Sequence, residues 1–213
     1  MSTLRVLAIS GSLRKDSYNT MLLRALPAIA PADMEFDYFD GLDEVPLYNE
    51  DLDGDPAPPA VARLREAIET HDGIVLATPE YLRGMPGVVK NALDWASRPV
   101  HRPAFAGKAV LVLVATPGRA LGFRSLAETS RVLTGMRNVV VPAPEVVVNN
   151  ADAVLAPDDD GGWRLTDPGA QAFIGVQLEI LADLMRANVA RTIEESFRRR
   201  SAELAARLTR NGR

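Results

Sequence analysis

The sequence predicts an α/β fold in which a parallel sheet carries helices on both faces. The first observation is an alternation of short apolar runs, rich in β-branched residues, with longer segments whose apolar residues recur every three or four positions. The second observation is the length of those longer segments, because a parallel connection needs a crossover of about a dozen residues or more. Strands that alternate with helices in this way indicate a sheet between two helical layers.

The expected strands are the most apolar stretches of the chain. Each combines aliphatic or aromatic residues in a run too short for an ordinary helix. They cover residues 4–10, 34–40, 73–79, 108–116 and 138–148. Five parallel strands fit a flavodoxin-like three-layer sandwich with the strand order 2-1-3-4-5.

The expected helices lie in the crossovers between these strands. They cover residues 19–29, 57–71, 87–97 and 124–136. Serine and asparagine lie at the start of the first helix, and the "PAPP" run at 56–59 begins the second. The run "DDDGG" at 158–162 is typical of an exposed turn.

The C-terminal region predicts helix from Gly169 to Arg210, because apolar residues recur there mostly every three, four or seven positions. One continuous helix of this length would span about 60 Å, whereas the domain itself is roughly 35 Å across. The helix must therefore break or project, and Asn188 is the candidate for a break. We divide the chain into a flavodoxin-like domain, residues 1–188, and an extension, residues 189–213. The extension is either a frayed charged tail or a helix that packs on a neighbouring subunit.

Composition excludes several classes of protein. The 213 residues, 47% of them hydrophobic, fit one globular domain, and the formal net charge of −4 gives no reason to expect a nucleic-acid partner. The absence of cysteine excludes disulfides, thiolate catalysis and cysteine-based metal sites. No apolar run approaches the roughly 18 residues of a membrane span, and the N-terminus lacks a signal-peptide layout. We expect a cytoplasmic protein without a membrane partner.

The stretch "SGSLRKDSYN" at residues 10–19 directly follows the first expected strand. Ligands of this fold bind beyond the carboxyl ends of the strands. Hydroxyls, a guanidinium and backbone N–H groups at the start of a helix can converge there on a phosphate. Neither a nucleoside-triphosphate loop nor a dinucleotide fingerprint is present. The same residues also fit a plain helix cap beside a solvated arginine, so two interpretations stay open at this point.

A second motif, "TPEYLRGMPGVVKNALDW" at residues 78–95, begins where the third strand ends. Its prolines and glycines lead into an amphipathic helix, a layout that presents backbone amides and Tyr81 to a flat ligand. Together with "GSLRKDSYN", this motif resembles the NADPH-dependent FMN reductase family, which includes quinone, azo-dye and chromate reductases. Either motif alone would be less specific than the two at their proper separation.

The resemblance implies FMN as the cofactor and NADPH or NADH as the hydride donor. It implies that the first loop holds the FMN phosphate through Ser12, Arg14, Ser17 and Asn19. It places two further loops along the isoalloxazine ring, at Pro79, Glu80 and Tyr81 by their backbone, and at Thr116, Gly118 and Gly122. Leu82 stands where the family usually has an asparagine that can contact the flavin, and we include it among the cofactor-binding positions.

The family's chemistry takes place on the flavin. Hydride passes from the nicotinamide to N5 of FMN and later to an acceptor over the same face, so no side chain is implied as acid, base or nucleophile, and no metal. The implied acceptors are quinones, azo compounds, chromate or free flavin. The implied assembly is a homodimer or tetramer. For Asn91, Asp94 and Trp95, on the helix after the second motif, we expect helix packing and a subunit contact.

Three positions depart from the family pattern. Leu82 and Gly84 replace an asparagine and a serine, and Leu121 replaces the first residue of a Gly-Gly pair. These departures support an alternative in which a diverged member keeps the fold as a binding or interaction protein with weak or lost FMN binding.

Two other classes share the strand order. A phosphoacceptor receiver domain needs an acidic pair after the first strand, where this chain has Ser10 and Gly11. It also needs an aspartate after the third strand, where this chain has Thr78 and Pro79, and this class is therefore excluded. A flavodoxin that only carries electrons would be more acidic, with aromatic residues sandwiching the ring, and would lack the "PGVVKNALDW" helix.

Overall fold

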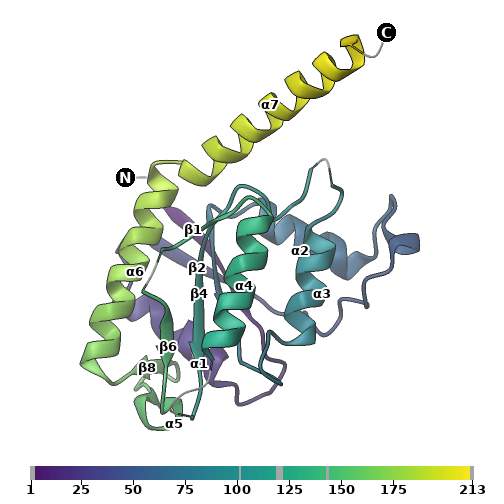
Figure 1. Ribbon diagram of the computed structural model, residues 1–213. Coiled ribbons are helices and arrows are strands. Elements are labelled where there is room, and N and C mark those ends of the chain that lie inside the picture. The colour runs from purple at the N-terminus through teal and green to yellow at the C-terminus, as the bar shows by residue number, and fades with distance from the viewer. Residues whose placement is uncertain (1–2, 101, 119–121, 143, 212–213) are drawn as a thin grey trace.

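The computed structural model of the chain describes residues 3–100, 102–118, 122–142 and 144–211. A parallel sheet lies between two layers of helices (Figure 1). Its long strands are β1 Leu4–Ser10, β2 Met34–Phe39, β3 Gly73–Ala77 and β4 Ala109–Ala115. The strand order is β2-β1-β3-β4-β5, which confirms the predicted order and puts β1 and β3 side by side at the centre.

Two short strands share the fifth position of the sheet. β5 Val139–Val140 pairs with the start of β4, and β6 Val146–Val148 pairs with its end. The sequence predicted one strand over 138–148. That continuity is wrong, because Pro142 and Pro144 lie between the two pieces and proline has no N–H to donate to the ladder.

The helices divide between the two faces of the sheet. One face carries α1 Tyr18–Ala25 and α6 Pro168–Arg186, and the other carries α2 Pro59–Glu69, α3 Gly87–Ala96 and α4 Phe123–Gly135. The first predicted helix continues past α1 as a 3₁₀ turn, η1 Leu26–Ile29, which contains Pro27. All four helices predicted in the crossovers are therefore present, with ends shifted by a few residues.

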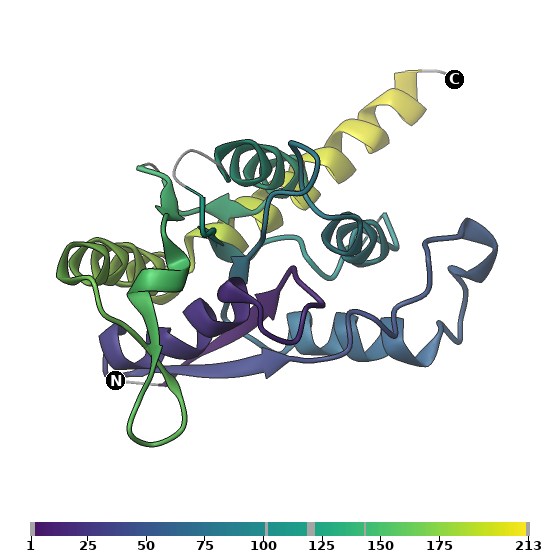
Figure 2. The same cartoon turned by 90° about the horizontal axis from the view of Figure 1, so that it is seen from below.

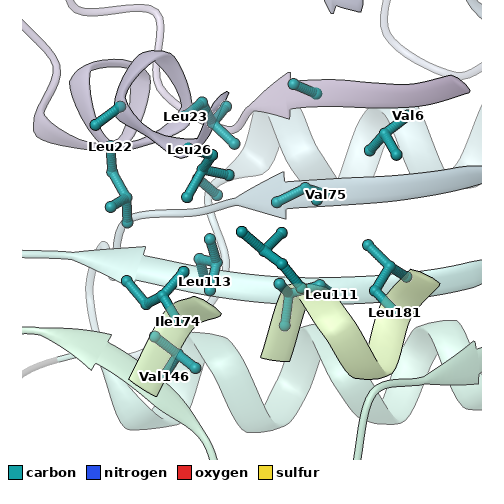
Figure 3. Close-up of a cluster of buried hydrophobic side chains, with 14 of the residues drawn as sticks. Val6, Leu22, Leu23, Leu26, Val75, Leu111, Leu113, Val146, Ile174 and Leu181 are labelled. Carbon is teal, nitrogen blue, oxygen red and sulfur yellow. The ribbon is translucent and has the colours of Figure 1, made fainter. Parts of the chain in front are cut away.

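The core is built from alternate residues of the central strands. Leu111 and Leu113 of β4 pack toward α1 and α6, whereas Val112 packs toward α3 and α4. Figure 3 shows the side of the sheet that faces α1 and α6, where Ile174 and Leu181 of α6 lie over β4. Burial on both faces explains why the strands read as continuous apolar runs and not as alternating ones.

A small excursion between β6 and α6 was predicted only as a turn. The one-turn helix α5 Ala151–Val154 leads into a hairpin of β7 Leu155–Pro157 and β8 Trp163–Leu165. The turn predicted at 158–162 joins these two strands. Each strand is three residues long, too short for a periodicity to be visible in the sequence.

The C-terminal region breaks where expected. α6 ends at Arg186, α7 Val189–Asn211 follows, and Asn188 between them has a left-handed φ of 51°. Figure 1 shows α7 leaving the three layers and pointing away from them. Within the described part of the chain, no helix is both long and apolar enough to cross a lipid bilayer.

Helix α3 packs more completely than the sequence indicated. Trp95 is fully buried and donates from Nε1 to the carbonyl oxygen of Pro46 at 2.7 Å. The Asn91 amide donates to the same oxygen at 2.9 Å and accepts from the Tyr48 N–H at 2.8 Å. The packing role is confirmed, but these two side chains hold a loop of their own subunit and offer a partner no surface. Asp94, ion-paired with Lys90, is the more exposed residue of the three.

Candidate functional site

Loops that follow β1, β3 and β4 meet at the carboxyl edge of the sheet, the edge onto which Figure 2 looks. They line an open cavity of about 360 Å³. The lining residues are Ser12, Arg14, Ser17, Tyr18, Asn19, Pro79, Glu80, Tyr81, Ala115, Thr116 and Pro117. The structure thus brings together every residue predicted in the first loop and most of those predicted in the other two. It adds Tyr18, Ala115 and Pro117, which the sequence analysis missed although each adjoins a predicted residue.

The N-terminus of α1 forms one end of the cavity. Ser17 caps the helix, because its Oγ accepts from the Thr20 N–H at 3.4 Å. The N–H groups of Tyr18 and Asn19 have no acceptor among the described residues, and the first turn contains no acidic side chain. The positive end of the helix dipole is therefore available to an anion.

Arg14 adds a full positive charge to this end. Its backbone N–H donates to Ser12 Oγ at 3.4 Å, and its guanidinium lies 5.1 Å from the centre of the Tyr18 ring. The side chain is exposed, so its N–H donors remain open to a ligand. Free N–H groups, hydroxyls and a guanidinium form the donor set that a phosphate requires.

The Asn19 side chain bonds to the end of β4. Its Nδ2 donates to the Ala115 carbonyl oxygen at 3.0 Å, and its Oδ1 accepts from the Ala115 N–H at 2.9 Å. Both ends of the buried amide are thus engaged with the end of β4. The side chain ties α1 to the central sheet, and its backbone N–H is the group left for a ligand.

Glu80 joins two of the loops around the cavity. Its side chain is only 6% exposed, and Oε2 accepts from the N–H groups of Gly122 at 2.9 Å and Arg124 at 3.1 Å. These groups form the N-terminus of α4, so the carboxylate caps that helix. The carbonyl oxygen of Pro79 accepts from Ser125 Oγ, at 2.9 Å. The loop after β3 is thereby fixed against α4.

The two predicted glycines after β4 do not line the cavity. Gly122 has a φ of 111°, and a Cβ there would lie 2.6 Å from Val114 Cγ1, so backbone conformation and packing both require glycine. Its N–H is engaged with Glu80, which argues against a contact with the flavin ring. The Gly118 N–H donates to Thr116 Oγ1 at 3.2 Å. Leu121, where the sequence departs from the family, lies outside the described residues.

Leu82, predicted among the cofactor-binding positions, also lies outside the cavity lining. The N–H and C=O groups of Tyr81 and Gly84 exchange two hydrogen bonds of 3.1 Å, which closes a two-residue turn. Both central residues, Leu82 and Arg83, have left-handed φ values, of 46° and 65°. An asparagine would tolerate this conformation better than leucine does. The Leu82 side chain is 102% exposed, so the departure from the family pattern changes the rim of the site and not its interior.

Gly84, the other departure in this loop, fits its surroundings. Glu128 Oε2 accepts from the Met85 N–H at 2.7 Å. A Cβ at position 84 would lie only 2.8 Å from that oxygen. The glycine therefore leaves room for a carboxylate that fixes the loop to α4. Among the described residues, no three His, Asp or Glu side chains are placed to hold a metal ion.

Comparison with known proteins identifies relatives of the chain. The family described as NADPH-dependent FMN reductase matches residues 4–153. An NAD(P)H-dependent FMN reductase of Pseudomonas aeruginosa is 39% identical over 178 residues, which cover 84% of this chain and 93% of the relative. A quinone reductase of Escherichia coli K12 is 40% identical over 154 residues, or 70% and 81% of the two chains. Among solved structures, the flavoenzyme NAD(P)H:acceptor oxidoreductase of Paracoccus denitrificans is 31% identical, with a TM-score of 0.76 over 87% of this chain and 99% of that chain.

Proposed function

The chain belongs to the NADPH-dependent FMN reductase family, and we propose that it holds FMN in the cavity at the N-terminus of α1 and reduces quinones with NAD(P)H. The family assigns the chain to the oxidoreductases that use FMN and NAD(P)H. The placement of the cofactor is our own proposal. The observation that carries it is the cluster of donors from Ser12, Arg14 and the first turn of α1 at one end of the cavity.

The donor set fits FMN better than a larger cofactor. It is built for a single phosphate, since one helix N-terminus and one guanidinium converge there. The adjoining walls are formed by Pro79, Tyr81 and Pro117, which suit a flat ring. FAD would need a second phosphate site and an adenine site, and the sequence contains no dinucleotide fingerprint.

The protein's part in the reaction is to position the cofactor and to stabilise negative charge on its ring. Bound FMN supplies the atom that takes up and gives back hydride. Arg14, Ser12 and the N–H groups of Tyr18 and Asn19 hold the phosphate and thereby set the depth of the ring. The Glu80 N–H lies in a backbone segment that is fixed to α4, and it would donate to the ring edge and favour negative charge there. Glu80 is engaged as a helix cap, so it is not assigned as a proton donor.

The acceptor is a small molecule. Quinones are the first choice, because several relatives are named quinone reductases. Azo compounds, chromate and free flavin are further acceptors that we propose from the family resemblance. NAD(P)H and the acceptor would use one open site in turn, which predicts ping-pong kinetics.

We further propose that the protein acts in the cytoplasm as a homodimer or tetramer. The family resemblance implies a subunit contact beside the flavin site, and the extension carries exposed apolar side chains. The competing idea, a binding protein that has lost FMN, is weakened by the structure. Its support was Leu82, Gly84 and Leu121, yet neither Leu82 nor Gly84 lines the cavity, and the donors at α1 are all in place.

The reaction is tested with purified protein reconstituted with FMN. Anaerobic addition of NADPH or NADH should bleach the flavin absorbance, and a quinone added afterwards should restore it. Initial rates at several concentrations of both substrates should give parallel lines in double-reciprocal plots. Intersecting lines, together with no bleaching by NAD(P)H alone, would reject the two alternating half-reactions.

A further inference from the structure

Helix α7 carries an exposed apolar stripe along its length. Ile193, Phe197, Leu204 and Leu208 are spaced by four, seven and four residues, so they lie on one side of the helix. They are 49% to 64% exposed. At about 100° per residue, Arg200 and Arg207 flank this stripe. Such a face is unusual on a helix that stays in water.

The base of α7 is firmly attached to the body of the protein. Ala190 and Glu194 are buried, and the Glu194 carboxylate accepts hydrogen bonds from Arg137 and, at 2.6 Å, from Arg198. Burial alone would raise the pKa of Glu194, but these two bonds outweigh it and lower the pKa below its ordinary value. The Arg137 guanidinium also lies 4.6 Å from the centre of the Phe197 ring. The exposed stripe is therefore held in a defined direction.

The extension and the rest of the chain have opposite charges. Residues 189–213 contain seven arginines and three glutamates, a net charge of +4. Because the whole chain carries −4, residues 1–188 carry −8. A basic apolar helix is thus attached to an acidic body, which favours its association with an acidic surface.

The loop at residues 40–55 is such a surface. It contains no lysine or arginine, and its exposed acidic residues are Asp40, Asp43, Glu44, Glu50, Asp51 and Asp55. Leu47 is 83% exposed and Leu52 is 47% exposed, so the loop also presents apolar side chains. An ion pair of 2.8 Å between Asp53 and Arg65 and the bonds from α3 to Pro46 hold the loop in place.

The two surfaces lie where a second copy can join them. Both α7 and the 40–55 loop project toward the same side of the molecule, on the right in Figures 1 and 2. In both views α7 stays clear of the loop of its own copy. A two-fold axis on that side would place the helix of each copy against the loop of the other.

We propose that the exposed part of α7 docks on the 40–55 loop of a second copy of this chain, with Arg200 and Arg207 facing Glu50 and Asp51. The apolar stripe would cover Leu47 and Leu52 at the same contact. This contact rests on the proposed self-association and names the two surfaces that form it. The contact does not depend on FMN binding. Titrating FMN into the same variants therefore shows separately whether the contact or the proposed chemistry has failed.

A charge exchange tests the proposal. The dissociation constant of the dimer is measured by sedimentation velocity over a dilution series for R200E/R207E, for E50R/D51R and for the chain with all four substitutions. Each double variant should associate at least tenfold more weakly than the wild type, and the fourfold variant should recover to within about threefold, because the opposite charges meet again. Two matched controls, T192E/R199E on the opposite side of α7 and D159K/D160K on the hairpin turn, should associate like the wild type.

Three outcomes would overturn the proposal. The fourfold variant could remain as weak as the double variants, which would show that the two surfaces do not meet. The double variants could associate like the wild type, which would make α7 a solvated appendage. Wild-type protein could remain monomeric and instead sediment with vesicles of 30% anionic and 70% zwitterionic phospholipid in a manner abolished by R200E/R207E, which would assign the helix to a membrane surface. The melting temperature of every variant is measured as well, and a value close to that of the wild type excludes loss of the fold as the cause of weaker association.

Discussion

The Glu80 carboxylate connects the loop after β3 with the N-terminus of α4, and its effect on the site is indirect. The sequence placed Glu80 among the site residues, but its hydrogen bonds to Gly122 and Arg124 connect positions more than forty residues apart. No local pattern predicts such a distant cap. The same applies to Asn19, whose partner Ala115 lies 96 residues away. Residue types in these loops were predictable, and their individual bonding was not.

Removing the Glu80 cap should weaken both the fold and the cofactor site. Glu80→Ala leaves the Gly122 and Arg124 N–H groups without their acceptor, and we expect a loss of about 1–3 kcal/mol in the free energy of unfolding. FMN affinity should fall as well, because residues 79–81 lose their attachment to α4. Urea denaturation and flavin titration measure the two effects. Glu179→Ala, at an exposed position on α6, is the control. If Glu80→Ala were as stable as Glu179→Ala, the capping role of Glu80 would be contradicted.

The partly buried side chain of Lys108 should make the stability of the fold depend on pH. Its Nζ donates to the carbonyl oxygens of His71 at 2.6 Å and Glu69 at 3.2 Å. Burial, followed by the charge of Arg191, lowers the pKa of Lys108 to about 8. In the unfolded chain the pKa returns to about 10.4. Between these values the unfolded chain holds a proton that the folded chain has lost, so stability increases with pH in this window and the cost of burying the charge is largest below it.

We therefore compare wild-type protein with Lys108→Met by urea denaturation at pH 7.5, 8.5 and 9.5. The stability of the wild type relative to the variant should increase with pH, by at most about 1.4 kcal/mol per unit. The increase should cease above roughly pH 10.5, where lysine is neutral in both states. A difference that stays constant from pH 7.5 to 9.5 would show that Lys108 is not desolvated as described.

At the scale of elements, a strand was predictable where both of its faces are buried, and a helix was predictable where its apolar residues recur over several turns. β3 and β4 are buried throughout and read as apolar runs, and α6 shows its helical period clearly. Prediction failed where elements are very short, as in the β7 and β8 hairpin, and where Pro142 and Pro144 split one strand position into two. The break at Asn188 was predictable because a helix of that length could not fit one domain.

The two ends of α7 should respond differently to truncation. Residues 199–209 are exposed, so ending the chain after Arg198 should leave the melting temperature nearly unchanged while reducing association. Ending the chain after Asn188 also removes Glu194, and Arg137 then loses its partner. We expect a further loss of about 2 kcal/mol, as for a part-buried ion pair deprived of one member. Calorimetry and light scattering measure the two effects, and identical melting of both truncations would contradict the anchoring of α7 by Glu194.

At the scale of the whole molecule, the strand order explains why three loops far apart in sequence form one site. Parallel strands all end at the same edge of the sheet. The chain adds β2 on one side of β1 and then β3 on the other side, and this change of side leaves a crevice between the loops after β1 and β3. This placement followed from the alternation of strands and helices alone. The depth of the cavity and the exclusion of Leu82, Gly118 and Gly122 from its lining depend on loop conformations that no periodicity encodes.

The central claim is that the N-terminus of α1 anchors the phosphate of FMN, and a flavin fluorescence titration tests it most directly. Wild-type protein, Arg14→Ala and the control Arg24→Ala, at the other end of α1, are titrated with FMN and with riboflavin, which lacks the phosphate. Arg14→Ala should weaken FMN binding by on the order of 1.5–3 kcal/mol through the loss of a charge-assisted bond, with little change for riboflavin and none for the control. FMN affinity that is the same in wild type and Arg14→Ala, or the same for FMN and riboflavin in the wild type, would contradict the account.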